Sequence, residues 1–321
     1  MKSFLIKIVK LSVAFYALLW LLQFVIDNGL KSSKDEMYYD WNKIYNGEIN
    51  AEIIFLGSSR TLKHYDPDIF EDKLNMISYN LGANGAPFDI QVIKRKAYLK
   101  NNKKPNLMVL NVDIGSLLST NELYKKEQYL PYYSFDNFKD LKSLDENVIF
   151  EYVFPMLKYR DNFDLIVLSA NAYFNTYHSK VKTNKGYHGS HQSWNGEFEK
   201  QKKELNGNKF DYSHVDYKDR VTFFKKTIKE IDDANTEVLL VWAPEYFERQ
   251  YLEGDMFIKS KKMFKTVSNE YDRVRFIDFT NDNICNSKTY FYDSYHLNKK
   301  GASIFSSQLS DSITKYYRNQ K

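Results

Sequence analysis

Cysteine is almost absent from this chain, which disfavours two kinds of stabilising site. Cys285 is the one cysteine among 321 residues, so no internal disulfide can form and a thiolate-rich structural zinc site is disfavoured. The simplest interpretation of Cys285 is a small, partly buried hydrophobe. Internal repeats and low-complexity tracts are missing too, and with 43% hydrophobic residues the composition predicts a globular protein.

A concentrated basic surface is also missing. The formal net charge is +5, but the basic residues are scattered and partly balanced by Asp and Glu. No basic stripe interleaves with aromatic residues, so the sequence predicts no nucleic-acid partner. We also expect no cofactor. His188, His191 and Trp194 fall in one polar stretch, but acidic ligands at metal spacing are not near them, so we predict no metal site.

The N-terminus carries one long apolar run. Three lysines lie within the first ten residues, and Leu11 to Ile26 is apolar except for Ser12 and Gln23. With the preceding turn this is just long enough to cross a bilayer, and the lysines predict that the C-terminal side faces outward. A cleaved signal peptide is the alternative, but no small-residue cleavage site follows Ile26. We therefore expect a membrane anchor (1–27), a juxtamembrane connector (28–50) and an extracytoplasmic domain (51–321), periplasmic or at the cell surface.

Strand-like and helix-like segments alternate after residue 51, which predicts an α/β domain with a parallel sheet and right-handed crossovers. The expected strands are 53–56, 76–79, 107–112, 237–242 and 274–279, and the expected helices include 90–99, 220–232, 256–267 and 300–317. Residues 114–215 interrupt this pattern as an insertion. Within it, 147–157 and 165–172 suit helices, and 184–211 suits a loop.

Three turns at the ends of predicted strands carry groups suited to acyl transfer. They contain Ser58 and Ser59, then Asn84 and Gly85, then Asp293 with His296. Ligands of open parallel sheets bind at that edge. A serine there can act as a nucleophile, the histidine as its general base and the aspartate as the group that orients the imidazole. The backbone N–H groups of Ser59 and Gly85 suit an oxyanion hole. The alternative is a serine that only caps a helix.

These blocks resemble the SGNH (GDSL-like) hydrolase family. Phe55-Leu56-Gly57-Ser58-Ser59 is similar to the family's Gly-Asp-Ser block, Asn80 to Gly85 to its Asn-x-Gly-x-x-Gly block, and Asp293 to His296, with Leu297-Asn298, to its Asp-x-x-His block. The resemblance implies a three-layer flavodoxin-like sheet. It also implies the roles of nucleophile for Ser59, oxyanion glycine for Gly85, base for His296 and orienting group for Asp293.

The third family block departs from the pattern. Asp113 in Leu110-Asn111-Val112-Asp113 stands where the family has an asparagine that donates to the oxyanion, and an ionised carboxylate cannot donate. Asn84 is a candidate substitute donor, although a role in the turn is the simpler interpretation. Arg60 is a candidate for binding a substrate carboxylate or phosphate, against the simpler interpretation of a solvated surface arginine.

Gly-Ser-Ser in place of Gly-Asp-Ser resembles a membrane-anchored branch that works beside membrane-bound O-acyltransferases. That resemblance implies an esterase or O-acyltransferase acting on acyl groups of a cell-surface glycan. The alternative is a non-catalytic protein that presents glycan to such an acyltransferase or scaffolds it, which the altered third block favours. A sugar-binding module built on the aromatic-rich insertion has no motif behind it.

Overall fold

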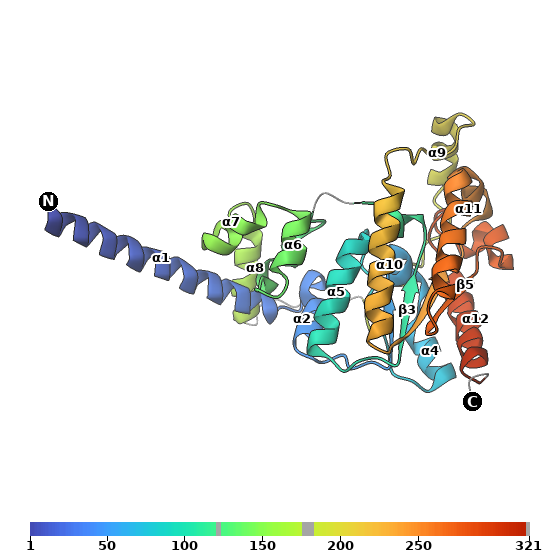
Figure 1. Cartoon of the computed structure of the whole chain (residues 1–321), viewed down its shortest axis with the longest axis horizontal. Coiled ribbons are helices and arrows are strands. Elements are labelled where there is room, and N and C mark those ends of the chain that lie inside the picture. Colours follow the sequence, from blue (N-terminus) through green and yellow to red (C-terminus); the bar gives the residue numbers. More distant parts are fainter. Residues whose placement is uncertain (120–122, 175–182, 319–321) are drawn as a thin grey trace. The chain divides into compact units, whose positions relative to one another are not determined.

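A computed structural model describes residues 1–119, 123–174 and 183–318, and the chain divides into two compact units (Figure 1). The helical unit combines Met1–Asn46 with Thr120–Lys182, and the sheet unit combines Gly47–Ser119 with Thr183–Lys321. Parts of the predicted insertion, 120–122 and 175–182, lie outside the described residues.

The sheet unit is built on five parallel strands in the order β2-β1-β3-β4-β5. This flavodoxin-like order confirms the predicted α/β fold class. Ile53 of β1 is in register with Ser78 of β2 and Leu107 of β3. Continuous apolar runs make the central strands fully buried, as expected for a parallel sheet covered on both faces. The strands are β1 (Ile53–Leu56), β2 (Ser78–Asn80), β3 (Leu107–Asn111), β4 (Glu237–Trp242) and β5 (Val274–Asp278).

Helices cover both faces of this sheet, giving three layers. One face packs on α3 (Ser59–His64), α4 (Pro67–Leu74) and α12 (Lys299–Arg318), where Phe55 meets Phe70 at 4.5 Å between ring centroids. The other face carries α5 (Phe88–Asn101), α10 (Tyr217–Asp233) and α11 (Phe247–Asn269), which Figure 1 draws in front of the sheet.

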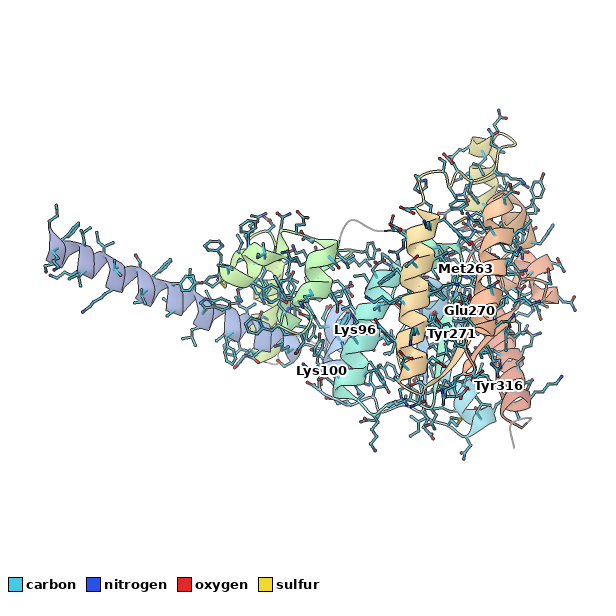
Figure 2. All side chains as sticks on the ribbon, viewed as in Figure 1. Lys96, Lys100, Met263, Glu270, Tyr271 and Tyr316 are labelled. Atoms are coloured by element: carbon cyan, nitrogen blue, oxygen red, sulfur yellow. The ribbon has the colours of Figure 1, made fainter. Side chains whose placement is uncertain are left out.

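The predicted inner face of α5 is the buried one. Ile90, Ile93 and Ala97 are buried, while Lys96 and Lys100, four residues apart, are exposed on the outer side (Figure 2). Most other residues of α5 are buried as well, so exposure is confined to a narrow strip of the helix.

Short helices make up the helical unit around the long N-terminal one. The helix α1 (Lys2–Lys31) is long and apolar enough to cross a membrane, with a mean hydropathy of 2.0 over its most apolar window. Its length and composition are those of a membrane anchor or a signal sequence. The others are α2 (Glu36–Tyr45), α6 (Phe138–Leu144), α7 (Val148–Val153) and α8 (Phe163–Tyr173).

One sequence expectation differs from this architecture. Residues 184–211 contain the helix α9 (Glu197–Leu205), although we predicted a loop. Phe198 anchors this charged helix by packing on Tyr246, so tertiary contact overrides its polar composition. Of the predicted insertion, residues 120–182 belong to the same compact unit as α1, and residues 114–119 and 183–215 belong to the sheet unit.

Candidate active site

The first strand ends in a turn that places Ser59 at the carboxyl edge of the sheet. Gly57 has φ +157°, and a Cβ there would lie 1.9 Å from Oγ1 of Thr61. The Thr61 hydroxyl in turn donates to the carbonyl of Leu56 at 3.2 Å. Only glycine fits so close an approach, and Ser59 follows as the first residue of α3.

Three of the predicted site residues lie in one hydrogen-bonded row. Ser59 Oγ is 2.7 Å from Nε2 of His296, and Nδ1 of His296 is 2.8 Å from Oδ2 of Asp293. Ser59 as a whole residue is 8% exposed. Ser58 precedes it as the N-cap residue of α3, but its side chain makes no capping hydrogen bond.

Asp293 settles which nitrogen of His296 carries the proton. A carboxylate only accepts, so Nδ1–H donates to Asp293 and the Nε2 lone pair faces the Ser59 hydroxyl. Oδ1 of Asp293 also accepts from the backbone N–H groups of Tyr295 at 2.8 Å and His296 at 2.7 Å. Burial works against the charge, but the hydrogen bond from His296 and these N–H groups outweigh it and lower the pKa of Asp293.

Neighbouring rings, which the motifs did not indicate, hold the His296 imidazole in place. Tyr292 stacks on it in parallel at 5.2 Å, and Tyr295 meets it edge-on at 5.3 Å. His64 accepts a hydrogen bond at Nε2 from the N–H of Leu297. Burial, with the nearby charge of Arg60, moves the pKa of His64 well below its usual value, so His64 is a neutral support of this loop.

The second turn is shaped by Asn80 and Gly85. The Asn80 side chain donates to the carbonyls of Thr61 and Tyr65, and it accepts from the N–H of Gly82. Asn84 and Gly85 form the exposed tip, closed by the N–H of Ala86 on the carbonyl of Ala83. Gly85 has φ +69°, the left-handed conformation that the third residue of a type II β-turn requires.

Arg60 is not the solvated surface residue that was the simpler expectation. Its side chain is 0% exposed and lies 3.2 Å from Oδ2 of Asp113. It also donates to the carbonyls of Ala243 and Pro244, and its guanidinium lies 4.8 Å from the Tyr295 ring centroid. The two terminal nitrogens of the Arg60 guanidinium are therefore bound by groups of the protein itself.

Asp113 is equally enclosed. It is buried, it caps the short 3-10 helix Ile114–Leu117, and it accepts from the amide of Asn111 at 3.3 Å. The position that departs from the family pattern is thus one half of an internal ion pair with Arg60.

Buried charges around Arg60 are unequal in number. Glu245 lies 3.8 Å from the guanidinium of Arg60, and Arg249 pairs with Glu253 at 2.8 Å. Three carboxylates, with Asp113, therefore accompany two guanidinium groups. Burial raises the pKa of Glu245 to about 7 although Arg60 acts in the opposite direction, so Glu245 holds a proton in mildly acidic solution.

We expect Glu245→Gln to remove a pH-dependent loss of stability. A raised pKa in the folded state means that this group stabilises the fold fully below pH 4.5, and that this contribution disappears as pH rises to about 7. At 1.36 kcal/mol for each pH unit, the difference between wild type and variant grows to about 3 kcal/mol by pH 8. Urea unfolding of both proteins from pH 5 to 8 measures it. The exposed Glu204→Gln is the control, and parallel curves for wild type and Glu245→Gln would contradict the assignment.

The remaining sequence candidates take structural positions. The N–H of His188 donates to the carbonyl of Leu62, and the Trp194 ring packs 5.0 Å from that of Tyr246. Across the described residues no group of three or more His, Cys, Asp or Glu side chains is placed to hold a metal ion.

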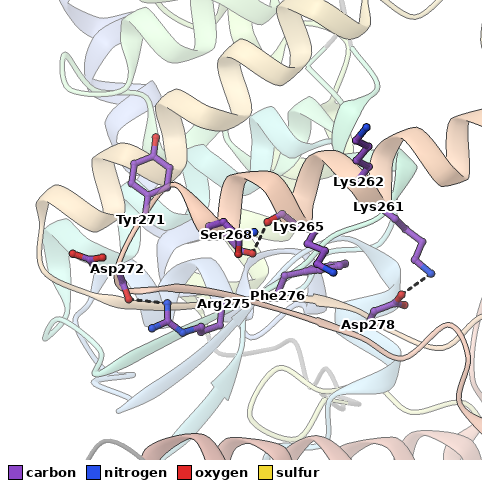
Figure 3. Close-up of a pocket in the computed structure, with 10 residues that line it drawn as sticks. Lys261, Lys262, Lys265, Ser268, Tyr271, Asp272, Arg275, Phe276 and Asp278 are labelled. Atoms are coloured by element: carbon purple, nitrogen blue, oxygen red, sulfur yellow. Dashed lines mark hydrogen bonds and ion pairs between the residues drawn. The ribbon is translucent and has the colours of Figure 1, made fainter.

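The described part of the sheet unit carries hollows at more than one place. The smaller, of about 290 Å³, borders the proposed base loop at Asp293 and Tyr295 and is flanked by α9 and Arg249. The larger, of about 780 Å³, lies between α11 and β5 (Figure 3). Its basic rim consists of Lys261, Lys262, Lys265 and Arg275. Neither hollow is lined by Ser59 or His296. Of these two, the smaller hollow adjoins the candidate site, through Asp293.

Comparison with known proteins yields only distant structural likenesses. No family model and no curated protein matches the sequence. A structure described as "a putative platelet activating factor" from Streptococcus pneumonia aligns at 12% identity with a TM-score of 0.41, over 96% of this chain and 98% of that one. "A putative acylhydrolase" from Bacteroides fragilis aligns at 12% identity with a TM-score of 0.40, over 82% and 86%. At these values neither likeness bears on activity.

Proposed function

We propose that the chain is a serine-dependent esterase or O-acyltransferase of the SGNH type. The observation that carries this proposal is the row from Ser59 through His296 to Asp293, with hydrogen-bond distances of 2.7 and 2.8 Å. Nucleophile, base and orienting group come from two loops at one edge of the sheet, and their order matches the family blocks that the sequence resembles.

The row supports a two-step acyl transfer. Ser59 Oγ attacks the ester carbonyl while its proton moves to Nε2 of His296, and the imidazolium is stabilised by Asp293. The tetrahedral adduct collapses, and the leaving alcohol takes that proton. The acyl-serine is then attacked by water or by a sugar hydroxyl, whose proton passes to His296 and on to the released Ser59.

Backbone N–H groups are the proposed oxyanion donors. As the first residue of α3, Ser59 has no carbonyl one turn back in its own helix to accept its N–H. The N–H of Gly85, at the exposed tip of the second turn, is the proposed second donor, with Asn84 beside it. Asp113 and Arg60 are assigned no contact with substrate, because both side chains are buried and bound to each other and to neighbouring groups of the protein.

We further propose that α1 is retained as a membrane anchor. Oδ1 of Asp27 lies 2.8 Å from Nζ of the buried Lys158, and Gln23 accepts from the N–H of Met156 at 2.7 Å. Cleavage after Ile26 would remove part of this packing and disturb a buried cation's pairing, which is costly. An anchored enzyme facing outward suits an acylated or acyl-accepting cell-surface glycan, with a membrane-bound O-acyltransferase as partner.

A fluorophosphonate probe tests this function directly. The purified full chain should form a covalent adduct on Ser59, because an activated serine attacks the phosphorus and displaces fluoride. Ser59→Ala should abolish labelling, whereas the adjacent Ser58→Ala should retain it, with the adduct located by peptide mass spectrometry. Labelling that survives in Ser59→Ala would assign the nucleophile elsewhere.

A second candidate is a non-catalytic, glycan-presenting or scaffolding partner of a membrane-bound O-acyltransferase. The enclosed Asp113, which offers no donor to an oxyanion, is the observation in its favour. This candidate predicts a folded wild-type protein that the fluorophosphonate leaves unlabelled.

A further inference from the structure

One face of α7 is apolar and uncovered. Phe150 is 54% exposed and Phe154 is 52% exposed, and Ile149 and Val153 lie beside them. We call these four residues the α7 face: Ile149, Phe150 and Val153 share one side of the helix, and Phe154 is the residue that ends it. Large apolar side chains gathered in this way on the outside of a protein mark a surface that contacts something other than water.

The α7 face adjoins the middle of α1. The Tyr16 hydroxyl donates to the carbonyl of Val153 at 2.5 Å, and Gln23 accepts from the N–H of Met156 at 2.7 Å. Near the end of α1, the Ser169 hydroxyl of α8 donates to the carbonyl of Ile26 at 3.0 Å. The chain after α7 thus follows α1 from Tyr16 toward its C-terminal end.

The contact between Tyr16 and the end of α7 corresponds to a considerable depth in a bilayer. Tyr16 lies 11 residues before Asp27, which is roughly 16 Å along a helix that rises 1.5 Å per residue. The hydrocarbon core of a bilayer is about 30 Å thick. If the apolar part of α1 crosses that core and ends at Asp27, the end of α7 lies near the middle of the core.

The charged residue within α7 is turned inward, and the exposed Glu146 and Asn147 lie just before the helix begins. Glu151 of α7 pairs with Lys126 at 2.8 Å and accepts from the Tyr133 hydroxyl at 2.9 Å, so its charge is compensated inside the unit. By contrast, the exposed side of α6 carries Lys139, Lys142 and Ser143. Within one small unit, the exposed residues of α7 are therefore apolar and those of α6 polar, as at a boundary between lipid and water.

We propose that the α7 face is embedded in the leaflet on the C-terminal side of α1, where it contacts lipid acyl chains. Like the exposed Leu18 and Leu22 of α1, the α7 face is apolar, and a crossing helix must present such side chains to lipid. The helical unit then holds the membrane by two elements, which restrains the tilt and rotation of α1. This proposal rests on the anchoring role of α1 but not on the chemistry at Ser59.

Site-directed spin labels in phospholipid nanodiscs test the depth of the α7 face. Cys285 is 1% exposed, so it should remain unlabelled in the folded full chain. Phe154→Cys and Phe150→Cys report the α7 face, Ser143→Cys is the matched control on α6, and Leu18→Cys reports α1. Collisions of each label with oxygen, which concentrates in lipid, are compared with collisions with a water-soluble nickel chelate.

The proposal expects labels at 150, 154 and 18 to favour oxygen and the label at 143 to favour nickel. Nickel access at 150 and 154 with oxygen access at 18 overturns the proposal but leaves the anchor intact. Nickel access at all four positions overturns the anchor as well. If neither reagent reaches the labels at 150 and 154, the proposed lipid contact is also overturned. In that case protein, such as a second copy, covers the α7 face.

Discussion

Replacing His296 by alanine should reduce kcat/KM for a simple acyl ester by roughly 10³- to 10⁶-fold, the range found when a base is removed from a serine–histidine site. The reason is geometric. Nε2 of His296 lies 2.7 Å from the Ser59 hydroxyl, and Nδ1 of the same ring is hydrogen-bonded to Asp293. Without that acceptor, Ser59 must attack as a neutral alcohol. Hydrolysis of an aryl acetate by the full chain, followed as release of the phenolate, measures the effect.

Two controls separate lost chemistry from lost structure. His191→Ala changes an exposed histidine of the same unit and should leave the rate unchanged. Added imidazole should restore part of the activity of His296→Ala, since the space beside the Tyr292 ring matches the ring that was removed. A His296→Ala protein that folds normally and keeps the wild-type rate would rule out His296 as the base.

Much of the sheet could be predicted because its strands are continuous apolar runs. Ile53–Leu56 and Glu237–Trp242 have the predicted bounds. The second strand was placed at 76–79, but it runs from Ser78 to Asn80. This edge strand is short and its polar side chains are buried through hydrogen bonds, such as that of Ser78 to Pro67, which hydrophobic pattern does not report.

The grouping of the helical unit could not be read from local pattern. Ser169 lies 2.1 Å from where a Cβ on Gly29 would stand, so α1 and α8 approach closely through a glycine more than a hundred residues away in the chain. Sequence periodicity locates each helix separately but not this contact. For that reason the stretch after residue 114 was predicted as a single insertion.

Site residues that belong to short motifs could be proposed from the sequence. The neighbouring residues that hold them in position could not. The spacing of Asp293 and His296 places both on one loop. The Tyr292 and Tyr295 rings that flank His296 carry no motif, and neither does Arg60, whose partners come from three separate segments. Burial of a charged side chain depends on such distant partners, and a six-residue helix is too short to show an inner face.

Replacing Arg60 by methionine should destabilise the fold by about 3–5 kcal/mol, the cost typical of removing one partner from a buried ion pair. The variant leaves Asp113 without its guanidinium at 3.2 Å and Glu245 without its cation at 3.8 Å. It also removes the donor to the carbonyls of Ala243 and Pro244. Urea unfolding at pH 8, where Glu245 is largely ionised, should show the full loss.

A double-mutant cycle distinguishes the ion pair from mere packing. Asp113→Asn alone should be destabilising because it weakens the pair. The double variant Arg60→Met with Asp113→Asn should recover part of the stability lost in Arg60→Met, because a neutral amide then replaces the unpaired buried carboxylate. Arg60→Lys should not substitute, because an ammonium group cannot reach Asp113 and both backbone carbonyls in one plane. Strictly additive effects would show that Arg60 and Asp113 do not act as a pair. Coupling would instead explain why an aspartate is tolerated where the family it resembles has an asparagine, because the chain supplies Arg60 to neutralise it.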